Sequence, residues 1–137
     1  MDNQSLIKAA LEARENAYAP YSDFCVGAAL LTKEGRVYKG CNIENASYTP
    51  TNCAERTAFF KAVSEGERTF AAIAIVGGAK GKVTGYAAPC GVCRQVMMEF
   101  CDPKTFRILV AVSEEEYVEH TLEEMLPMGF GPVNLHK

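Results

Sequence analysis

The feature that most constrains the fold is an alternation, along all 137 residues, between segments with helical spacing and segments with strand character. Apolar residues recur at helical spacing over residues 5–17. Two strand-like runs follow at 25–32 and 36–44, joined by the short turn K-E-G. This order predicts a helix that leads into a β-hairpin.

The rest of the chain repeats a helix-then-strand order. Helical spacing predicts helices over 53–64 and 91–101, and each precedes a buried-looking strand, at 70–76 and 106–112. Helices that alternate with strands in this way predict a mixed sheet covered by helices on both faces. The sequence therefore favours an α/β fold.

Weaker patterns complete this outline. Thr121 and Glu124 match a capping box that opens a last short helix. The stretch G-G-A-K-G-K-V-T-G, residues 77–85, lacks the GxxxxGK[ST] pattern of a phosphate loop, and we expect a mobile connection there. No linker or internal repeat divides the chain, so we expect one domain over residues 1–137.

Charge and composition restrict the function. A net charge of −3 disfavours a protein that wraps nucleic acid, because such binding relies on basic side chains that neutralise phosphates. The start M-D-N-Q-S-L-I-K has neither the basic end nor the apolar run of a signal peptide, and no stretch is long enough to span a bilayer. We therefore expect a cytoplasmic protein, in which six cysteines indicate metal or catalytic thiols rather than disulfides.

Two short segments contain the candidate chemistry. A-P-C-G-V-C places Cys90 and Cys93 at a helix start, and such a C-x-x-C pair suits zinc, a thioredoxin-like redox pair or simple packing. T-N-C-A-E-R opens the earlier helix, where Asn52 could be an N-cap and Glu55 its capping-box partner. On that interpretation, the cysteine is an ordinary buried residue and the arginine an ordinary exposed one.

A metal site explains both segments together. Side chains in the first turn of a helix lean toward its N-terminus, so Cys53 and Glu55 can address one point beyond the helix end, as can Cys90 and Cys93. Three thiolates around Zn²⁺ leave a fourth position open, as in catalytic rather than structural zinc sites. Because such a cluster is negatively charged, we expect Arg56 to donate to the sulfur of Cys53 or Cys90.

The segments C-A-E, residues 53–55, and P-C-G-V-C, residues 89–93, resemble the signature of the zinc deaminases, with cysteine in place of histidine. Y-A-P-Y-S-D-F-C-V-G-A-A-L, G-C-N-I-E-N-A-S-Y and M-L-P-M-G-F-G-P are similar to the small cytidine deaminases of nucleoside salvage, over essentially the whole chain. The resemblance implies a three-layer α/β/α fold with a mixed five-stranded sheet, one Zn²⁺ per subunit and a homotetramer. It also implies hydrolytic deamination of cytidine and 2′-deoxycytidine to uridine and 2′-deoxyuridine, with Glu55 as the residue that moves protons.

The same resemblance implies contacts to the sugar and the base. Asn42 and Glu44 would bind the ribose hydroxyls, although both could instead serve a turn and a strand end. Phe24 would lie against the pyrimidine ring, unless it is an ordinary core residue. The backbone N–H of Ala54 would hold O2 of the base, and the carbonyl of Ala88 would accept from the leaving amino group.

Further implied contacts lie toward the 5′ end of the nucleoside and at a subunit boundary. Ala46 and Tyr48 would lie near the 5′ end, and Phe130 would enter the site of a neighbouring subunit unless it merely packs. The loop before Pro89 is a few residues longer than in the compact bacterial pattern. Two other classes remain open: a nucleic-acid editing deaminase would need a basic groove, and a structural zinc module would need a fourth protein ligand.

Overall fold

A computed structural model of the protein describes residues 1–135, so His136, expected on the surface from the sequence, lies outside the described residues. The strands are β1 (Phe24–Thr32), β2 (Val37–Cys41), β3 (Phe70–Ala79), β4 (Arg107–Ala111) and β5 (Tyr117–Thr121). The helices are α1 (Asn3–Arg14), α2 (Ala54–Ser64), α3 (Gly91–Phe100), α4 (Leu122–Met125) and the 3₁₀ helix η1 (Pro132–Leu135).

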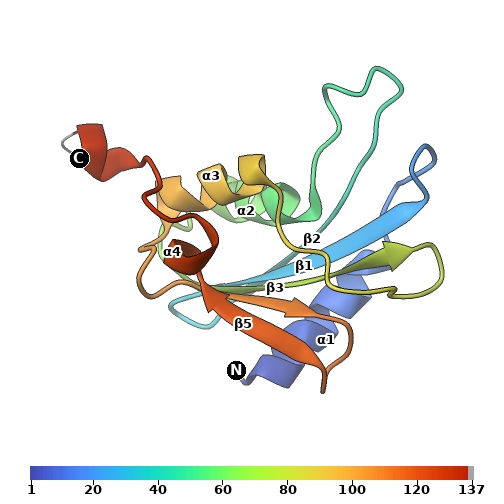
Figure 1. Ribbon diagram of the computed structural model, residues 1–137, viewed down its shortest axis with the longest axis horizontal. Helices are drawn as coiled ribbons and strands as arrows, with labels where there is room; N and C mark the ends of the chain where they lie inside the picture. The colour runs from blue at the N-terminus through green and yellow to red at the C-terminus, as the bar shows by residue number, and fades with distance from the viewer. Residues whose placement is uncertain (136–137) are drawn as a thin grey trace.

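The five strands form one mixed sheet in the order β2-β1-β3-β4-β5 (Figure 1). The predicted hairpin is present as the antiparallel pair β1–β2, and β1 also pairs antiparallel with β3. β3 and β4 are parallel, which requires a crossover connection, and α3 lies in that connection. The mixed five-stranded sheet expected from the resemblance is confirmed.

Helices cover both faces of the sheet, as predicted (Figure 1). On one face, α2, α3 and α4 pack around buried residues such as Phe59, Met97 and Leu122. On the other face, α1 contributes Leu6 and Ile7 to a second core. The strands supply both cores because alternate residues of a strand point to opposite faces.

A glycine sets the distance between α2 and the sheet. A Cβ atom on Gly40, in β2, would lie 2.5 Å from the carbonyl oxygen of Ala54 and 2.5 Å from the amide nitrogen of Ala58. Both atoms belong to the backbone of α2, so only glycine allows the helix to lie this close. The first turn of α2, which carries the predicted C-A-E segment, is positioned by this contact.

Three predictions from the sequence pattern are wrong in detail. The first helix ends at Arg14, because the amides of residues 15–17 each bond the carbonyl three residues earlier and so form single turns. Gly77–Ala79, expected in a mobile connection, belong to β3. β5 was absent from the pattern-based order, since its three central residues are exposed and show no apolar alternation. The capping box of Thr121 and Glu124 is confirmed.

Among the described helices, none combines the length and the apolar character needed to cross a membrane.

Candidate active site

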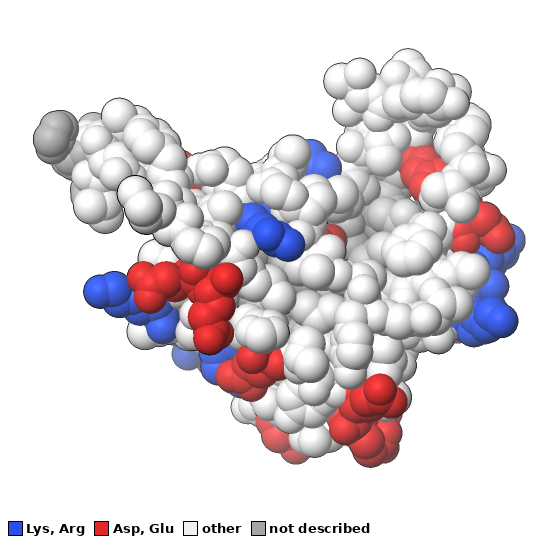
Figure 2. All heavy atoms as spheres, in the orientation of Figure 1, with Lys and Arg blue, Asp and Glu red and all other residues white. Residues whose placement is uncertain are grey.

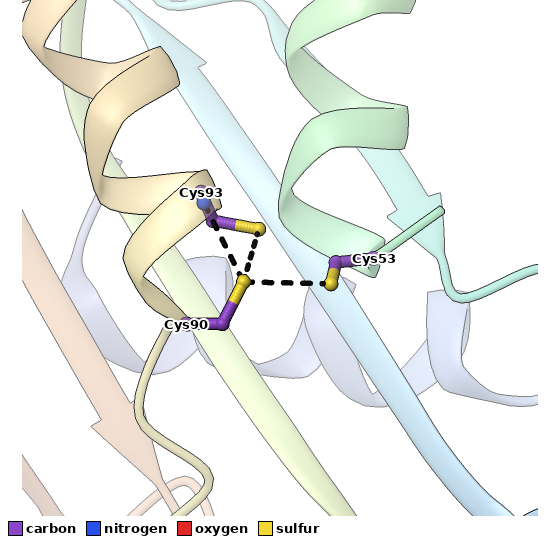
Figure 3. Close-up of side chains that lie close together, drawn as sticks. All are labelled: Cys53, Cys90 and Cys93. Atoms are coloured by element: carbon purple, nitrogen blue, oxygen red, sulfur yellow. Dashed lines mark hydrogen bonds between the residues drawn. The ribbon is translucent and has the colours of Figure 1, made fainter. Parts of the chain in front are cut away.

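The N-termini of α2 and α3 bring three cysteine sulfurs together (Figure 3). Cys53 is the N-cap of α2, Cys90 is the N-cap of α3, and Cys93 lies in the first turn of α3. The Sγ atoms of Cys53 and Cys90 are 3.7 Å apart, and those of Cys90 and Cys93 are 3.4 Å apart. All three sulfurs lie within 4.8 Å of one another, as a shared metal ion requires.

This donor set fits zinc. A Zn–S bond of about 2.3 Å in tetrahedral geometry separates the sulfurs by about 3.8 Å, close to the observed distances. Thiolates bind zinc more strongly than they bind harder cations such as Mg²⁺ or Ca²⁺. All six cysteines lie within the described residues and none forms a disulfide, so their thiols are available. Across residues 1–135, no fourth histidine, cysteine or carboxylate joins the cluster. An open ligand position is typical of a catalytic zinc site and argues against a structural module.

Charge within the cluster is unevenly distributed. The neighbouring Cys93 thiol, as a hydrogen-bond donor, and the Arg56 guanidinium lower the pKa of Cys53 to about 5, against an opposing effect of burial. The partnership with Cys53, together with burial, raises the pKa of Cys93. Arg56 Nη2 lies 3.2 Å from Cys53 Sγ, while Arg56 Nε is buried without a partner among the described residues. Of Cys53 and Cys93, Cys53 is therefore the one that more readily becomes a thiolate before a metal binds.

Glu55 follows Cys53 by two residues, in the first turn of α2. It is only 4% exposed, and this burial raises the pKa of its carboxyl to about 7. The interpretation of Asn52 and Glu55 as a capping box is wrong, because Cys53 is the N-cap and Glu55 is then the second helical residue, one short of the third. Asn52 Nδ2 instead donates to Thr57 Oγ1 at 3.2 Å. The buried carboxyl is thus free of a capping role.

A cavity of about 320 Å³ opens onto Glu55 and the cluster. Most residues predicted from the sequence to surround the substrate line it: Phe24, Asn42, Glu44, Cys53, Ala54, Glu55, Ala88 and Cys90. The sequence reasoning missed further lining residues, which are Ser22, Val26, Thr51, Asn52 and Ala87. In Figure 2 the surface is hollowed beside the projecting segment that links β2 and α2. None of the lining residues is Lys or Arg, so the cavity offers no cationic side chain to an anionic ligand.

Asn42 and Glu44 are held in the cavity wall by backbone groups. The Asn42 side chain accepts from the amide of Val26 at 2.9 Å and donates to the carbonyl of Phe24 at 2.8 Å. Glu44 accepts from the amides of residues 21 and 22 at 2.9 and 3.1 Å and from the hydroxyl of Ser22, and these bonds lower its pKa. Both side chains keep unused hydrogen-bonding capacity for a ligand, since each amide or carboxylate can make further bonds.

Three of the predicted contact residues do not line this cavity. Tyr48, with a left-handed φ of 65°, lines an adjacent cavity of about 350 Å³ that shares Ser22, Glu44 and Thr51 with the first. Ala46 is an exposed residue of the same projecting segment. Phe130 is 57% exposed and lines neither cavity.

Comparison with known proteins agrees with this geometry. Residues 1–109 match the family described as the cytidine and deoxycytidylate deaminase zinc-binding region. The chain belongs to this deaminase family. Its curated relatives include the cytidine deaminase of Halalkalibacterium halodurans, 55% identical over 130 residues, or 95% of each chain. Another is the cytidine deaminase of Sporosarcina psychrophila, 49% identical over 98% of this chain and 96% of that one.

Solved structures of deaminases share the fold. The crystal structure of cytidine deaminase from Burkholderia pseudomallei has a TM-score of 0.86 and 49% identity. The match covers 95% of this chain and 100% of that one. That of cytidine deaminase from Mycobacterium tuberculosis has a TM-score of 0.81 and 40% identity, covering 96% and 98%. The three-layer α/β/α fold predicted from the sequence is confirmed. Zinc is the cofactor, because the matched family region is a zinc-binding one and Cys53, Cys90 and Cys93 are positioned to bind a metal ion.

Proposed function

We propose that this protein is a cytidine deaminase that hydrolyses cytidine and 2′-deoxycytidine to uridine and 2′-deoxyuridine, with release of ammonia, in pyrimidine salvage. The observation that carries the proposal is the buried carboxyl of Glu55, which faces a cavity of about 320 Å³ beside an open three-cysteine cluster. Support also comes from the cytidine deaminases that are 49–55% identical to nearly the whole chain.

The chain's own residues have separate roles in this reaction. Zinc held by Cys53, Cys90 and Cys93 would supply Lewis acidity for the activation of water. Glu55 takes a proton from that water as its oxygen bonds to C4, and delivers this proton to N3 of the pyrimidine. Glu55 then carries the second proton of the same oxygen to the amino group, so that the C4–N bond breaks, ammonia leaves and the C4 carbonyl of the product forms. A carboxyl with a pKa of about 7 suits both steps, since it can accept and donate a proton near neutral pH.

Fixed polar groups would orient the nucleoside. The N–H of Ala54 is one of the first-turn amides that have no acceptor within the helix, so it is available for O2 of the base. The carbonyl of Ala88, in the facing wall, accepts from the leaving amino group. Asn42 and Glu44 bind the sugar hydroxyls, and Phe24, whose side chain is 42% exposed at the cavity, lies against the ring.

Assembly belongs to the same proposal. We infer a homotetramer of single-domain subunits, each formed by residues 1–137, in which Phe130 enters the site of a neighbouring subunit. The exposure of Phe130, and the course of the C-terminal segment away from the sheet in Figure 1, support this role. Ala46 and Tyr48 lie near the 5′ end of the nucleoside. The cytoplasmic location expected from the sequence stays a prediction.

Turnover of free nucleosides tests the function. The zinc-loaded protein is mixed in turn with cytidine, 2′-deoxycytidine and a cytosine-containing oligonucleotide, and the fall in ultraviolet absorbance and the release of ammonia are followed. We expect both nucleosides to be deaminated and the cytosines of the oligonucleotide to stay unchanged, because no basic residue lines the cavity to bind its phosphates. On the face in Figure 2, Lys and Arg side chains form no continuous band. Deamination of the oligonucleotide alone would refute the proposal.

A further inference from the structure

Arg14, the last residue of α1, is buried yet has no carboxylate partner among the described residues. A buried charge is costly unless hydrogen bonds compensate it. Four backbone carbonyls do so: Nε donates to Cys25 at 2.9 Å, and Nη2 donates to Gly78 at 3.1 Å and to Ala79 and Lys82 at 2.6 Å each. The C-terminal end of α1 adds favourable partial negative charge.

These carbonyls belong to two segments that lead into the substrate cavity. Cys25 follows Phe24 directly, and Phe24 lines the cavity. The other three carbonyls belong to the end of β3 and to the turn that follows it, where the amide of Lys82 bonds the carbonyl of Ala79. Gly81 has a φ of 89° in that turn, a conformation that residues with a side chain rarely adopt.

The segment after this turn folds back along β3 and forms one wall of the cavity. Gly77 and Gly85 form an antiparallel bridge. A Cβ atom on Gly77 would lie 2.7 Å from the Cβ of Ala87 and 3.2 Å from side-chain atoms of both Phe24 and Val26. All three neighbours line the cavity. The wall at Ala87 therefore packs directly on the strands whose ends Arg14 holds together.

A second arginine holds the other end of the same wall. Arg94, on α3, donates from Nε to the carbonyl of Pro89 at 2.8 Å and from Nη1 to the carbonyl of Met125 at 2.9 Å. Pro89 immediately precedes Cys90, so this bond fixes the metal-ligating end independently of Arg14. Loss of the Arg14 bonds would loosen the wall near Ala87 and leave Cys90 in place.

From these contacts we infer that Arg14 is a positioning residue of the deaminase. It acts through the turn at residues 79–82 and the start of β1 to hold Phe24 and Ala87 at the separation that fits the pyrimidine ring. The inference takes the identity of the substrate from the proposed function. The contacts of Arg14 are independent of that function. It predicts that Arg14 governs substrate binding, whereas zinc binding and the chemical step depend on other residues.

The substitution Arg14→Lys tests this role in the zinc-loaded full-length protein. Lysine keeps the charge but cannot replace a planar fork that donates in several fixed directions. We expect the KM for cytidine to rise about tenfold, because small misplacements of a site wall weaken binding. We expect kcat to stay within about twofold and zinc content to stay at one per chain. Hydrogen exchange of the amides in residues 78–88 should accelerate, with α2 and α3 unaffected.

Two further variants complete the test. Arg68→Lys is the matched control, since Arg68 also donates to backbone carbonyls, of Val63 and Glu67, but at the surface. It should leave KM and exchange unchanged. Gly81→Ala strains the same turn without removing the guanidinium, and it should raise KM in the same selective way. A fall in kcat together with lost zinc, or unchanged KM in both Arg14→Lys and Gly81→Ala, would overturn the inference. If the unaltered protein does not deaminate cytidine, the proposed function fails, whereas the exchange measurement still tests Arg14.

Discussion

The substitution Gly40→Ala would test whether the packing of α2 on β2 sets the geometry of the zinc site. The new Cβ would lie 2.5 Å from Ala54 O and Ala58 N and 3.0 Å from Ala58 Cα. These are backbone atoms, so no side-chain rotation relieves the overlap. Restoring ordinary contact, at about 3.5 Å, moves the first turns of α2 by about 1 Å. Overpacking of this kind costs about 1–3 kcal/mol of stability.

The displacement affects only part of the metal site. Cys53 is the N-cap of α2 and moves with it, whereas Cys90 and Cys93 belong to α3. Zinc–ligand distances tolerate deviations of only about 0.2 Å, so a shift of about 1 Å spoils the 3.7 Å spacing between the sulfurs of Cys53 and Cys90. We expect zinc affinity to fall by about 10- to 100-fold, the range seen when ligand positioning is disturbed.

Competition with a chromophoric zinc chelator measures this loss, and urea unfolding of the zinc-free chain measures the stability. Gly85→Ala is the matched control, because a Cβ there has no heavy atom within 4 Å. Unaltered zinc affinity in Gly40→Ala, or an equal loss in Gly85→Ala, would refute the reasoning.

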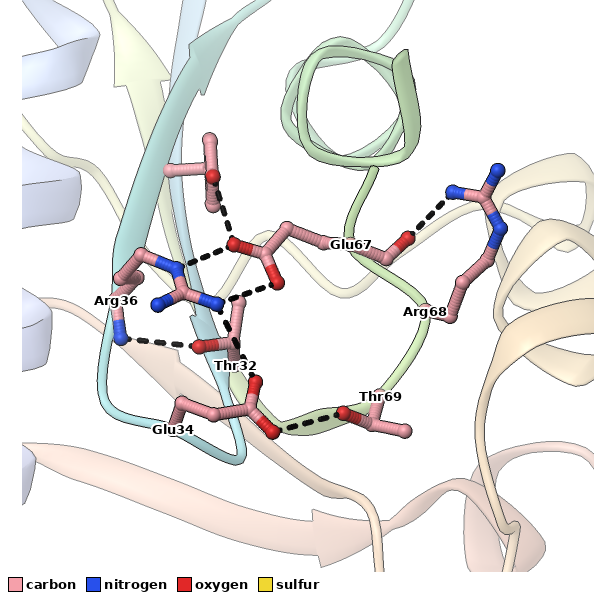
Figure 4. Close-up of polar contacts among 7 residues, drawn as sticks. Thr32, Glu34, Arg36, Glu67, Arg68 and Thr69 are labelled. Carbon is pink, nitrogen blue, oxygen red and sulfur yellow. Dashed lines mark hydrogen bonds and ion pairs between the residues drawn. The ribbon is translucent and has the colours of Figure 1, made fainter. Parts of the chain in front are cut away.

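Three other substitutions test individual side chains. Glu55→Gln should keep zinc but lower kcat by about 10²- to 10⁴-fold, since it removes the proton carrier, and near-normal turnover would exclude that role. Arg56→Gln should lower kcat while the circular dichroism spectrum stays unchanged. A kcat equal to that of the parent would show that Arg56 has no electrostatic role in the reaction. The guanidinium of Arg36 (Figure 4) and the hydroxyl of Tyr38 both bond the Glu67 carboxylate and hold its pKa below the ordinary 4.5. The stabilisation from these bonds is therefore complete above pH 4.5 and disappears as pH falls through the folded-state pKa. Urea midpoints should therefore show Glu67→Gln less stable than the parent at about pH 7, with the difference shrinking as pH falls through the folded-state pKa of Glu67.

The elements that could be predicted from sequence are those whose burial leaves a regular pattern, either helical spacing or a continuous apolar run. β3 and β4 are almost wholly buried, and their continuous apolar runs reveal them. β5 lies at the edge of the sheet with its centre exposed, so its residues follow no apolar period, and only the family resemblance supplied a fifth strand. Gly77–Ala79 resembled a loop because glycine signals turns, although here it permits close contact between β3 and Ala87.

The candidate site divides in the same way. The cluster of Cys53, Cys90 and Cys93 was predictable because each ligand is the N-cap or a first-turn residue of a helix, where local geometry restricts the side-chain direction. Ser22 and Thr51 were missed because they reach the cavity from irregular segments whose paths depend on distant contacts. Short-range spacing therefore identified the metal ligands, and longer-range packing decided the rest of the wall.

The N-cap cysteines of α2 and α3 differ in whether the sulfur accepts a bond from its own helix, and this difference explains the position of Arg56. Both N-cap cysteines have extended backbones, but the sulfur of Cys90 accepts a bond from the amide of Cys93 at 3.5 Å, whereas the side chain of Cys53 makes no capping bond. Charge on Cys90 is thus offset by its own helix, and charge on Cys53 needs another donor. Arg56, in the first turn of the same helix, supplies it at 3.2 Å. Arg56 on α2 therefore serves the N-cap sulfur that has no backbone donor, whereas Arg94 on α3 bonds backbone carbonyls instead.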